Sequence, residues 1–199
     1  MTDTALCGEF GVTATVSAAV TAGVTLVQLR DPLATDAELV ALGRSIRQVL
    51  QGVPLIVNDR VHLVAEIGAD GAHVGQADLP VTDARAMLGD AAYLGLSVQT
   101  VEQVAAAGPL AALDYLGAGP VWPQSTKPDA ADPGGLDMLA GIVARSPWPV
   151  VAIGGVTAAG MPLLRSAGAA GGAVVSAICG QPDVTAATAA LRAAWERAA

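Results

Sequence analysis

Short apolar segments rich in β-branched residues alternate with longer segments rich in Ala and Leu along most of the chain. The short segments lack the polar–apolar alternation of half-exposed strands, so we expect strands that are buried on both faces. The longer segments have the length and composition of helices. Seven strands are predicted, at residues 24–29, 55–57, 72–74, 93–96, 115–117, 150–153 and 173–175. Eight helices are predicted, at residues 13–22, 37–50, 61–67, 84–88, 101–107, 136–144, 161–167 and 184–198.

Threonines precede several predicted helices, where a side-chain oxygen can cap the first backbone N–H groups. We expect N-caps at Thr35, Thr82, Thr100 and Thr157. Gln103 follows Thr100 by three residues, which predicts a reciprocal capping box at that helix. These signals place the predicted helix starts between successive strands.

The alternation of strands and helices predicts one parallel sheet in a single domain over residues 1–199, and it favours a (β/α)₈ TIM barrel. The alternative is an open doubly wound sheet. Two observations oppose that alternative: no G-x-G-x-x-G follows an early strand, and polar residues follow nearly every strand. A barrel begins with a strand, whereas this chain begins with helix-like sequence. We therefore expect a first strand truncated at the N-terminus, of which only Thr2 and Asp3 remain.

The chain is apolar and acidic, which excludes several classes of partner. Hydrophobic residues make up 53% of its 199 residues, and the net charge is −8. An acidic chain without a Lys/Arg cluster is a poor candidate for binding nucleic acid or an anionic membrane, and no apolar run reaches the ~18 residues of a membrane span. Two isolated cysteines, Cys7 and Cys179, predict no disulfide framework and a cytoplasmic location. We expect small-molecule substrates, and the sequence leaves a homodimer open.

Two aspartates follow neighbouring predicted strands, and in a barrel the C-terminal ends of the strands carry the chemistry. Asp59 follows one strand and Asp78 the next, and neighbouring strands lie about 4.8 Å apart. Two carboxylates so placed can share one Mg²⁺ ion. Each Asp taken alone is better explained as the cap of a helix or turn. As a pair on adjacent strands, they favour a metal site.

Two cationic residues can accompany this pair. Arg30 and Gln28 lie on one side of the first predicted strand and can hold a phosphate or a ring. The alternative for Arg30 is an ion pair with Asp31 or Asp59. Lys127 is the one lysine of the chain and lies in a Pro-rich loop that is longer than a connector needs, which favours a function over a solvated loop lysine.

The loops after the last two predicted strands often bind phosphate in this fold. Gly154–Gly155 follows one of these strands and Ser176 the other. Tight turns that require glycine are the alternative, and both interpretations can hold. His62 and His73 lack a plausible ligand set and are interpreted as structural. Ser97 has no neighbouring base in the sequence, so we expect it to form hydrogen bonds rather than act as a nucleophile.

Taken in order, these motifs resemble those of the thiamine-phosphate synthases over residues 12–199. The family pattern is Q-L-R-E-K, N-D-R, G-x-D-G-x-H-L-G-Q-x-D-L-P, G-x-S, G-P-V-F-P-T-x-T-K, A-I-G-G-I and V-S-A-I. The chain has, in the same order, QLRDP, NDR, GADGAHVGQADLP, GLS, GPVWPQSTK, AIGGV and VSAI. The ordered set is much more specific than any single motif.

The resemblance implies a TIM-barrel transferase that requires Mg²⁺. Its substrates would be 4-amino-2-methyl-5-(diphosphooxymethyl)pyrimidine and a thiazole phosphate, and its products thiamine monophosphate and pyrophosphate. By match, five residues would hold the pyrimidine pyrophosphate: Gln28, Arg30, Asn58, Ser97 and Lys127, with Arg30, Ser97 and Lys127 as the catalytic ones. Asp59 and Asp78 would bind Mg²⁺. The thiazole phosphate would meet Gln124, Ser125 and Thr126, with its phosphate group on Gly155, Val175 and Ser176.

Such a coupling needs charge stabilisation rather than a protein nucleophile. Pyrophosphate leaves a carbon beside an aminopyrimidine that stabilises the cation, and the thiazole nitrogen then attacks. Mg²⁺, Arg30 and Lys127 would neutralise the charge that develops on the leaving group.

The chain departs from the family pattern at two positions: Pro32 replaces a lysine and Gln124 replaces a threonine. These departures favour one alternative, a barrel that binds a phosphorylated ligand without catalysis. A second alternative is a relative resembling thiazole tautomerases, which share the barrel but require a proton shuttle that "GAGPVWP" lacks.

Overall fold

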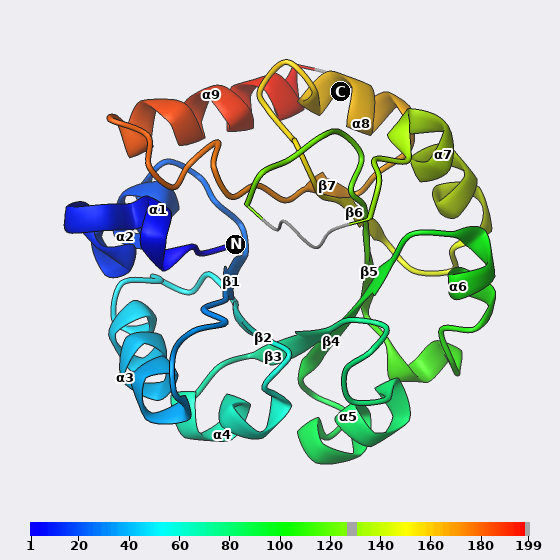
Figure 1. Cartoon of the computed structure of the whole chain (residues 1–199), viewed down its shortest axis with the longest axis horizontal. Coiled ribbons are helices and arrows are strands. Elements are labelled where there is room, and N and C mark those ends of the chain that lie inside the picture. The colour runs from blue at the N-terminus through cyan, green and yellow to red at the C-terminus, as the bar shows by residue number, and fades with distance from the viewer. Residues whose placement is uncertain (127–130, 198–199) are drawn as a thin grey trace.

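A computed structural model describes residues 1–126 and 131–197. Within these residues seven parallel strands form one curled sheet of the TIM type, surrounded by a ring of helices (Figure 1). The strands are paired in chain order, each with its sequence neighbour. Their bounds are β1 Val27–Leu29, β2 Leu55–Asn58, β3 Gly71–Val74, β4 Tyr93–Val98, β5 Tyr115–Ala118, β6 Val150–Ala152 and β7 Gly171–Gly172.

Helices connect successive strands and cover the outside of the sheet (Figure 1). The α-helices are α1 Thr4–Cys7, α2 Val12–Thr21, α3 Asp36–Arg47, α4 Val64–Ile67, α5 Val81–Leu88, α6 Val101–Ala105, α7 Gly135–Arg145, α8 Met161–Ser166 and α9 Val184–Glu196. Three short 3₁₀ helices are η1 Gly8–Phe10, η2 Val61–Leu63 and η3 Leu110–Ala112. All eight predicted helices are found, whereas α1, η1 and η3 were not expected. None of the helices described in residues 1–126 and 131–197 combines the length and apolar character needed to span a bilayer.

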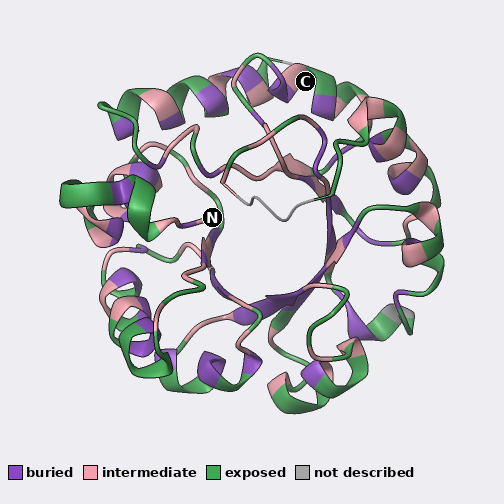
Figure 2. Ribbon diagram, viewed as in Figure 1, coloured by how far each residue is buried: buried purple, intermediate pink, exposed green. Residues whose placement is uncertain are grey.

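The strands are apolar because both of their faces are covered. Leu55, Ile56 and Val57 of β2 have no exposed surface, and neither do Leu94 and Leu116 on the following strands. Figure 2 shows buried residues along the strands and on the sides of the helices that face them. This pattern is the reason that the strands lack polar–apolar alternation.

Two of the four predicted caps are present. Thr35 and Thr100 each accept a hydrogen bond from the third helical N–H, and both belong to complete capping boxes. The caps expected at Thr82 and Thr157 are wrong. Helix α5 begins at Val81, three residues before the predicted start and directly after Pro80, and α8 begins at Met161 with a proline in its first turn.

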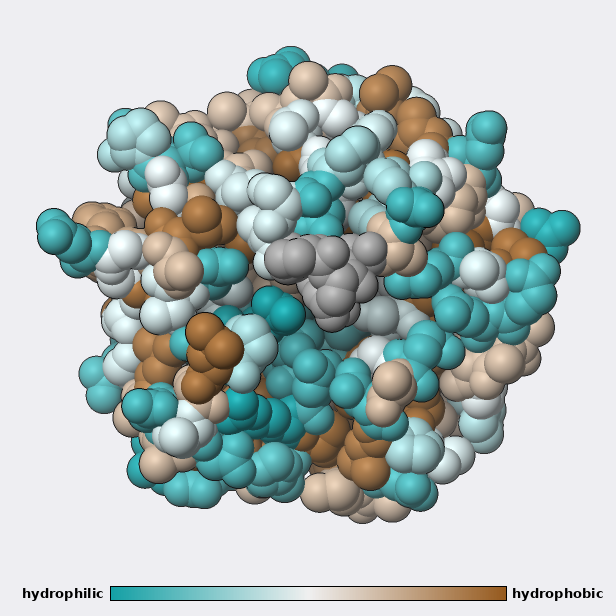
Figure 3. All heavy atoms as spheres, in the orientation of Figure 1, coloured by the Kyte–Doolittle hydropathy of each residue, from teal (hydrophilic) through white to brown (hydrophobic). Residues whose placement is uncertain are grey.

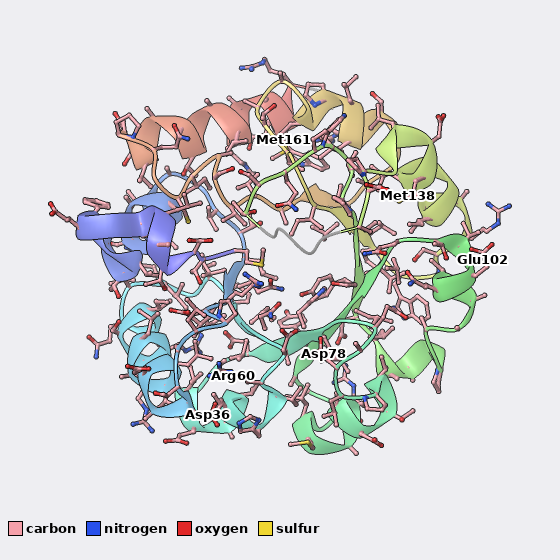
Figure 4. All side chains as sticks on the ribbon, in the orientation of Figure 1. Asp36, Arg60, Asp78, Glu102, Met138 and Met161 are labelled. Carbon is pink, nitrogen blue, oxygen red and sulfur yellow. The ribbon has the colours of Figure 1, made fainter. Side chains whose placement is uncertain are left out.

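The last strand lies earlier in the chain than predicted. We expected it at residues 173–175, which are the apolar ones, but β7 consists of Gly171 and Gly172. A Cβ atom on Gly172 would lie 2.8 Å from Sδ of Met161, which is labelled in Figure 4. The strand therefore falls on glycines because α8 packs closely against it, a requirement that hydrophobicity does not reveal.

The prediction of a closed eight-stranded barrel is wrong, because the sheet of the described residues has seven strands. The N-terminal residues lie between the two edge strands without forming a strand (Figure 1). The Met1 amino group donates to the Val174 carbonyl oxygen (2.9 Å), and the Thr2 N–H donates to the Gln28 carbonyl oxygen (2.8 Å). The Thr2 hydroxyl donates to the Arg30 carbonyl oxygen (3.0 Å) and accepts from the Arg30 N–H (2.8 Å). Two residues thus bridge the seam between β1 and the segment after β7.

Removing the Thr2 hydroxyl should loosen this seam. Thr2 is buried, and Thr2→Val would leave the Arg30 N–H without its partner. We expect the free energy of unfolding to fall by about 1–3 kcal/mol, the cost of a buried unpaired polar group. The matched control is Thr21→Val, because the Thr21 hydroxyl is exposed and bonds only within its helix. Equal losses in urea unfolding of the two variants would contradict the role of Thr2.

Candidate active site

The C-terminal ends of all strands lie on one rim, because the sheet is parallel throughout. Figure 1 views the molecule from this rim, and Figure 3 shows hydrophilic residues gathered near the centre of the same face, over the ends of β2 and β3. The register pairs Gln28 with Ile56 and Asn58 with His73. The polar residues predicted from separate motifs therefore come together here.

Asp59 directly follows β2 and adopts an unusual backbone conformation. Its φ of 60° lies in the left-handed region, and its N–H donates to the His73 carbonyl oxygen of β3 (2.8 Å). The Arg60 N–H then donates to the Asn58 carbonyl oxygen (2.7 Å) as the chain turns into η2. Non-glycine residues in this conformation cost free energy and cluster at functional sites. The turn holds the Asp59 backbone against the end of β3.

Asp78 closes a turn after β3, as the capping alternative predicted. Its Oδ2 atom accepts a hydrogen bond from the Gly75 N–H (2.7 Å), and its own N–H donates to the Gly75 carbonyl oxygen (3.3 Å). A carboxylate can accept about four hydrogen bonds or ligand contacts, so one N–H does not saturate it. Asp78 can therefore hold the turn and also contact a cation.

The donor set fits Mg²⁺ that is held jointly with a phosphorylated substrate. Asp59 and Asp78 are exposed carboxylates that follow adjacent strands. Within residues 1–126 and 131–197, no group of three or more His, Cys, Asp or Glu side chains is placed to hold a metal ion. Mg²⁺ commonly takes one or two protein carboxylates and completes its shell with water and phosphate oxygens. Two hard oxygen donors open to solvent match that mode of binding.

Arg30 follows β1 and lies beside the Asn58–Asp59 turn. Arg30, Pro32, Asn58, Asp59 and Arg60 line one small pocket. Among the described residues Arg30 takes part in no ion pair, so the predicted alternative of a pair with Asp31 or Asp59 is not found. Arg30 is half-buried beside the turn, and its guanidinium group is suited to bind an anionic ligand.

Arg60 is a structural cation, although it stands in the same motif as Asn58 and Asp59. It donates to Oδ1 of Asp36 on α3 (3.0 Å), and Nε2 of His62 lies 2.9 Å from Oδ2 of the same carboxylate. Figure 4 shows Arg60 and Asp36 next to each other near α3 and α4. Hydrogen bonding to His62 and the charge of Arg60 lower the pKa of Asp36. His62 is thus structural, as predicted.

His73 lies inside the sheet and contacts two hydroxyl groups. Its Nε2 atom is 2.9 Å from Oγ of Ser97, and its Nδ1 atom is 2.9 Å from the Tyr115 hydroxyl oxygen. Burial lowers the pKa of His73 to about 4, and burial raises the pKa of Tyr115 above its usual value. The predicted ligand contact Ser97 therefore lies next to His73, which the sequence analysis interpreted as structural, and His73 lies next to Tyr115, which that analysis missed.

Tyr115 was missed because it lies in an apolar strand. A signal was nevertheless present, since Gly95 on the neighbouring strand β4 and Gly117 on β5 itself leave space inside the sheet. A Cβ atom on Gly95 would lie 2.2 Å from Cζ of Tyr115 and 2.4 Å from Nδ1 of His73. Glycines on buried strands thus mark the place of large side chains from neighbouring strands.

The loop after β5 packs against the double-glycine turn after β6. The Val121 N–H donates to the Ile153 carbonyl oxygen (2.9 Å), and the Trp122 N–H donates to the Gly154 carbonyl oxygen (3.0 Å). Gly154 and Gly155 have φ values of 95° and 66°. A Cβ atom on Gly155 would lie 2.5 Å from the Pro123 carbonyl oxygen. The tight-turn interpretation of these glycines is confirmed, and the turn also brings the backbone close to the loop.

The remaining predicted residues lie around this loop and after β7. The Thr126 hydroxyl donates to Oε1 of Gln124 (3.0 Å), and Ser125 is exposed. Ser176 is exposed at the turn after β7, where Val175 is buried. Lys127 lies outside the described residues.

Alanine at position 155 should disturb the loop as well as the turn. The matched control is Gly68→Ala, because Gly68 is left-handed with a φ of 73° and no atom lies within 4 Å of the place of an added Cβ. Both variants carry the cost of a left-handed backbone, about 1–2 kcal/mol. We expect Gly155→Ala to lose about 1–3 kcal/mol more free energy of unfolding, because its Cβ meets the Pro123 carbonyl group. Equal losses in chemical unfolding would contradict the packing argument.

Comparison with known proteins identifies relatives that match nearly the whole chain. The sequence profile of the thiamine monophosphate synthase family matches residues 1–178. A thiamine-phosphate synthase of a Psychrobacter species is 45% identical over 92% of this chain and 87% of its own length. The thiamine-phosphate synthase of Azorhizobium caulinodans is 45% identical over 93% of this chain and 88% of its own length. The solved structure of a thiamine phosphate pyrophosphorylase from Pyrococcus furiosus has a TM-score of 0.88 and 33% identity, covering 99% of this chain and 94% of that one.

Proposed function

Because this chain belongs to the thiamine monophosphate synthase family and is a transferase that forms thiamine monophosphate, we propose that its rim holds both substrates and Mg²⁺ in one site. The substrates are the pyrimidine methyl pyrophosphate and the thiazole phosphate, and pyrophosphate is released. One observation carries this proposal: the consecutive strands β1 to β3 present a cation, an amide and two carboxylates at the same rim.

Asp59 and Asp78 are the residues that would hold Mg²⁺, together with oxygens of the pyrophosphate. Bound there, Mg²⁺ would neutralise part of the negative charge on the leaving group. The support is chemical: two exposed carboxylates that follow adjacent strands suit a hard cation shared with phosphate oxygens.

Arg30, Asn58, Ser97 and Lys127 would hold the pyrimidine pyrophosphate, and Gln28 its ring. When the bond between carbon and the pyrophosphate oxygen breaks, both electrons leave with pyrophosphate, and the aminopyrimidine stabilises the cation that remains. Arg30 and Lys127 would stabilise the charge on the departing oxygens by fixed electrostatic contacts. Pro32 stands where the family pattern has a lysine, so the proposal assigns a larger share of this charge to Arg30.

The thiazole phosphate would bind opposite, beside the loop after β5. Gln124, Ser125 and Thr126 would contact it, and backbone groups at Gly155, Val175 and Ser176 would hold its phosphate. The thiazole nitrogen then forms the new bond to the pyrimidine methylene carbon with its own electron pair. This step releases no proton, so the rim needs no general base.

The remaining expectations concern the cellular location and the oligomeric state of the enzyme. Cys7 and Cys179 are buried free thiols, which supports the proposal of a reducing cytoplasm. The homodimer stays a prediction.

The direct test is turnover of the purified chain with both substrates and Mg²⁺. We expect thiamine monophosphate and pyrophosphate in equal amounts. Absence of product at every Mg²⁺ concentration would contradict the proposal.

Neutralising either carboxylate should abolish most of this turnover. We choose Asp59→Asn and Asp78→Asn, because Asn tolerates the left-handed backbone at position 59 and can still accept from the Gly75 N–H at position 78. Each variant should lose about 10²-fold or more in Mg²⁺-dependent kcat/KM, the scale of a lost charge-stabilising contact, with an unfolding midpoint near that of the wild type. The control is Asp90→Asn, an exposed carboxylate that precedes β4 at the opposite end of the sheet. Near-normal turnover of either rim variant would exclude a shared metal.

A further inference from the structure

Three side chains form a hydrogen-bonded row inside the sheet, one each from β3, β4 and β5. The row runs from the Tyr115 hydroxyl to the imidazole of His73 and to the Ser97 hydroxyl. We call these three residues the interior row. The proposed function assigns Ser97 to the pyrimidine pyrophosphate, whereas His73 and Tyr115 have no assigned role.

The register of the strands builds the centre of this row. Asn58 pairs with His73, His73 with Gly95 and Gly95 with Tyr115, so these four residues stand side by side on successive strands. Gly95 has no side chain, and the rings of His73 and Tyr115 meet over it with centroids 5.3 Å apart. The ring nitrogens of His73 are thereby held in place, and each faces one hydroxyl oxygen.

The backbone of Ser97 is fixed as well. Nε2 of Gln76 donates to the Ser97 carbonyl oxygen (2.7 Å), and Ser97 pairs with Gly117 in the sheet. Rotation of the hydroxyl group is the freedom that remains at Ser97. The partner at Nε2 of His73 therefore decides whether the Ser97 hydroxyl has a proton available for another group.

A neutral imidazole has one N–H donor and one acceptor, so the interior row can run in two directions. If the proton is on Nδ1, Ser97 donates to Nε2 and offers only lone pairs to a ligand. If the proton is on Nε2, His73 donates to Oγ of Ser97, and the Ser97 proton is free to point at a ligand. In that second case the Tyr115 hydroxyl donates to Nδ1 of His73.

The ligand of the proposed function distinguishes these directions, and the inference rests on that function. Pyrophosphate oxygens only accept hydrogen bonds. We propose that His73 is a positioning residue that carries its proton on Nε2, so that it turns the Ser97 hydroxyl proton toward the pyrophosphate. Both partners of the ring are hydroxyls rather than carboxylates, which suits an uncharged imidazole inside the sheet.

The tautomer can be read directly from the wild-type protein. The chain has two histidines, so labelling with ¹⁵N-histidine gives ring signals from His62 and His73 alone, and His62→Gln assigns them. In two-bond ¹⁵N–¹H spectra recorded without ligand and with inorganic pyrophosphate and Mg²⁺, His73 should be protonated on Nε2. Protonation on Nδ1 would overturn the proposal. This measurement does not depend on synthase activity, so it stands apart from a failure of the proposed function.

Two substitutions separate positioning from packing. The Gln amide nitrogen can reach the place of Nε2, whereas Asn reaches only the place of Nδ1. His73→Gln should therefore keep kcat/KM for the pyrimidine pyrophosphate within about threefold of wild type. His73→Asn and Ser97→Ala should each lose about tenfold or more, the scale of one lost hydrogen bond to a charged group. KM for the thiazole phosphate should change little in all three variants.

The double variant His73→Asn/Ser97→Ala completes the test. If His73 acts through Ser97, the double variant should be no slower than Ser97→Ala. Losses that multiply in the double variant would overturn the proposal, and so would a folded His73→Gln variant that is as slow as His73→Asn.

Discussion

Parallel pairing of each strand with its sequence neighbour is the constraint on which both the fold and the site depend. It sends every strand end to the same rim, so Arg30, Asn58, Asp59 and Asp78 meet although up to 48 residues separate them in the chain. The strand register also determines which side chains lie beneath the rim. It places Asn58, His73, Gly95 and Tyr115 side by side on successive strands. A shift of one residue would turn these side chains to the other face of the sheet.

The site that results has two layers with different electrostatics. The rim carries exposed or half-buried charged groups beside solvent, where a cation and an anionic ligand can enter. The layer beneath it is neutral and hydrogen-bonded: burial keeps His73 uncharged and the Tyr115 hydroxyl protonated. The charged layer suits neutralisation of a leaving pyrophosphate, whereas the neutral layer suits orientation of dipoles without placing a further charge inside the sheet.

The sequence predicted the elements that depend on local interactions and missed those that depend on tertiary contacts. Six strands and the helices follow from apolar runs and their length, and the capping boxes at Thr35 and Thr100 are local chemistry. The position of β7 depends on how closely Met161 approaches Gly172, and in residues 1–126 and 131–197 Thr2 bonds to Arg30 at the seam without forming a strand. Asp59 and Asp78 could be paired from sequence because they follow adjacent strands. The contact between His73 and Tyr115 could not be predicted in this way, because the space over Gly95 that holds both rings exists only when three strands are in register.

We propose that the two rim carboxylates and the cations beside them form a single site that binds Mg²⁺ and pyrophosphate together. Calorimetric titration of the wild-type chain and of Asp78→Asn with pyrophosphate, with and without saturating Mg²⁺ at fixed ionic strength, tests it most directly. The wild type should bind pyrophosphate at least about tenfold more tightly with Mg²⁺, a coupling of roughly 1.4 kcal/mol, and the variant should lose this gain. Equal affinity of the wild type with and without Mg²⁺, or an undiminished gain in the variant, would contradict the claim.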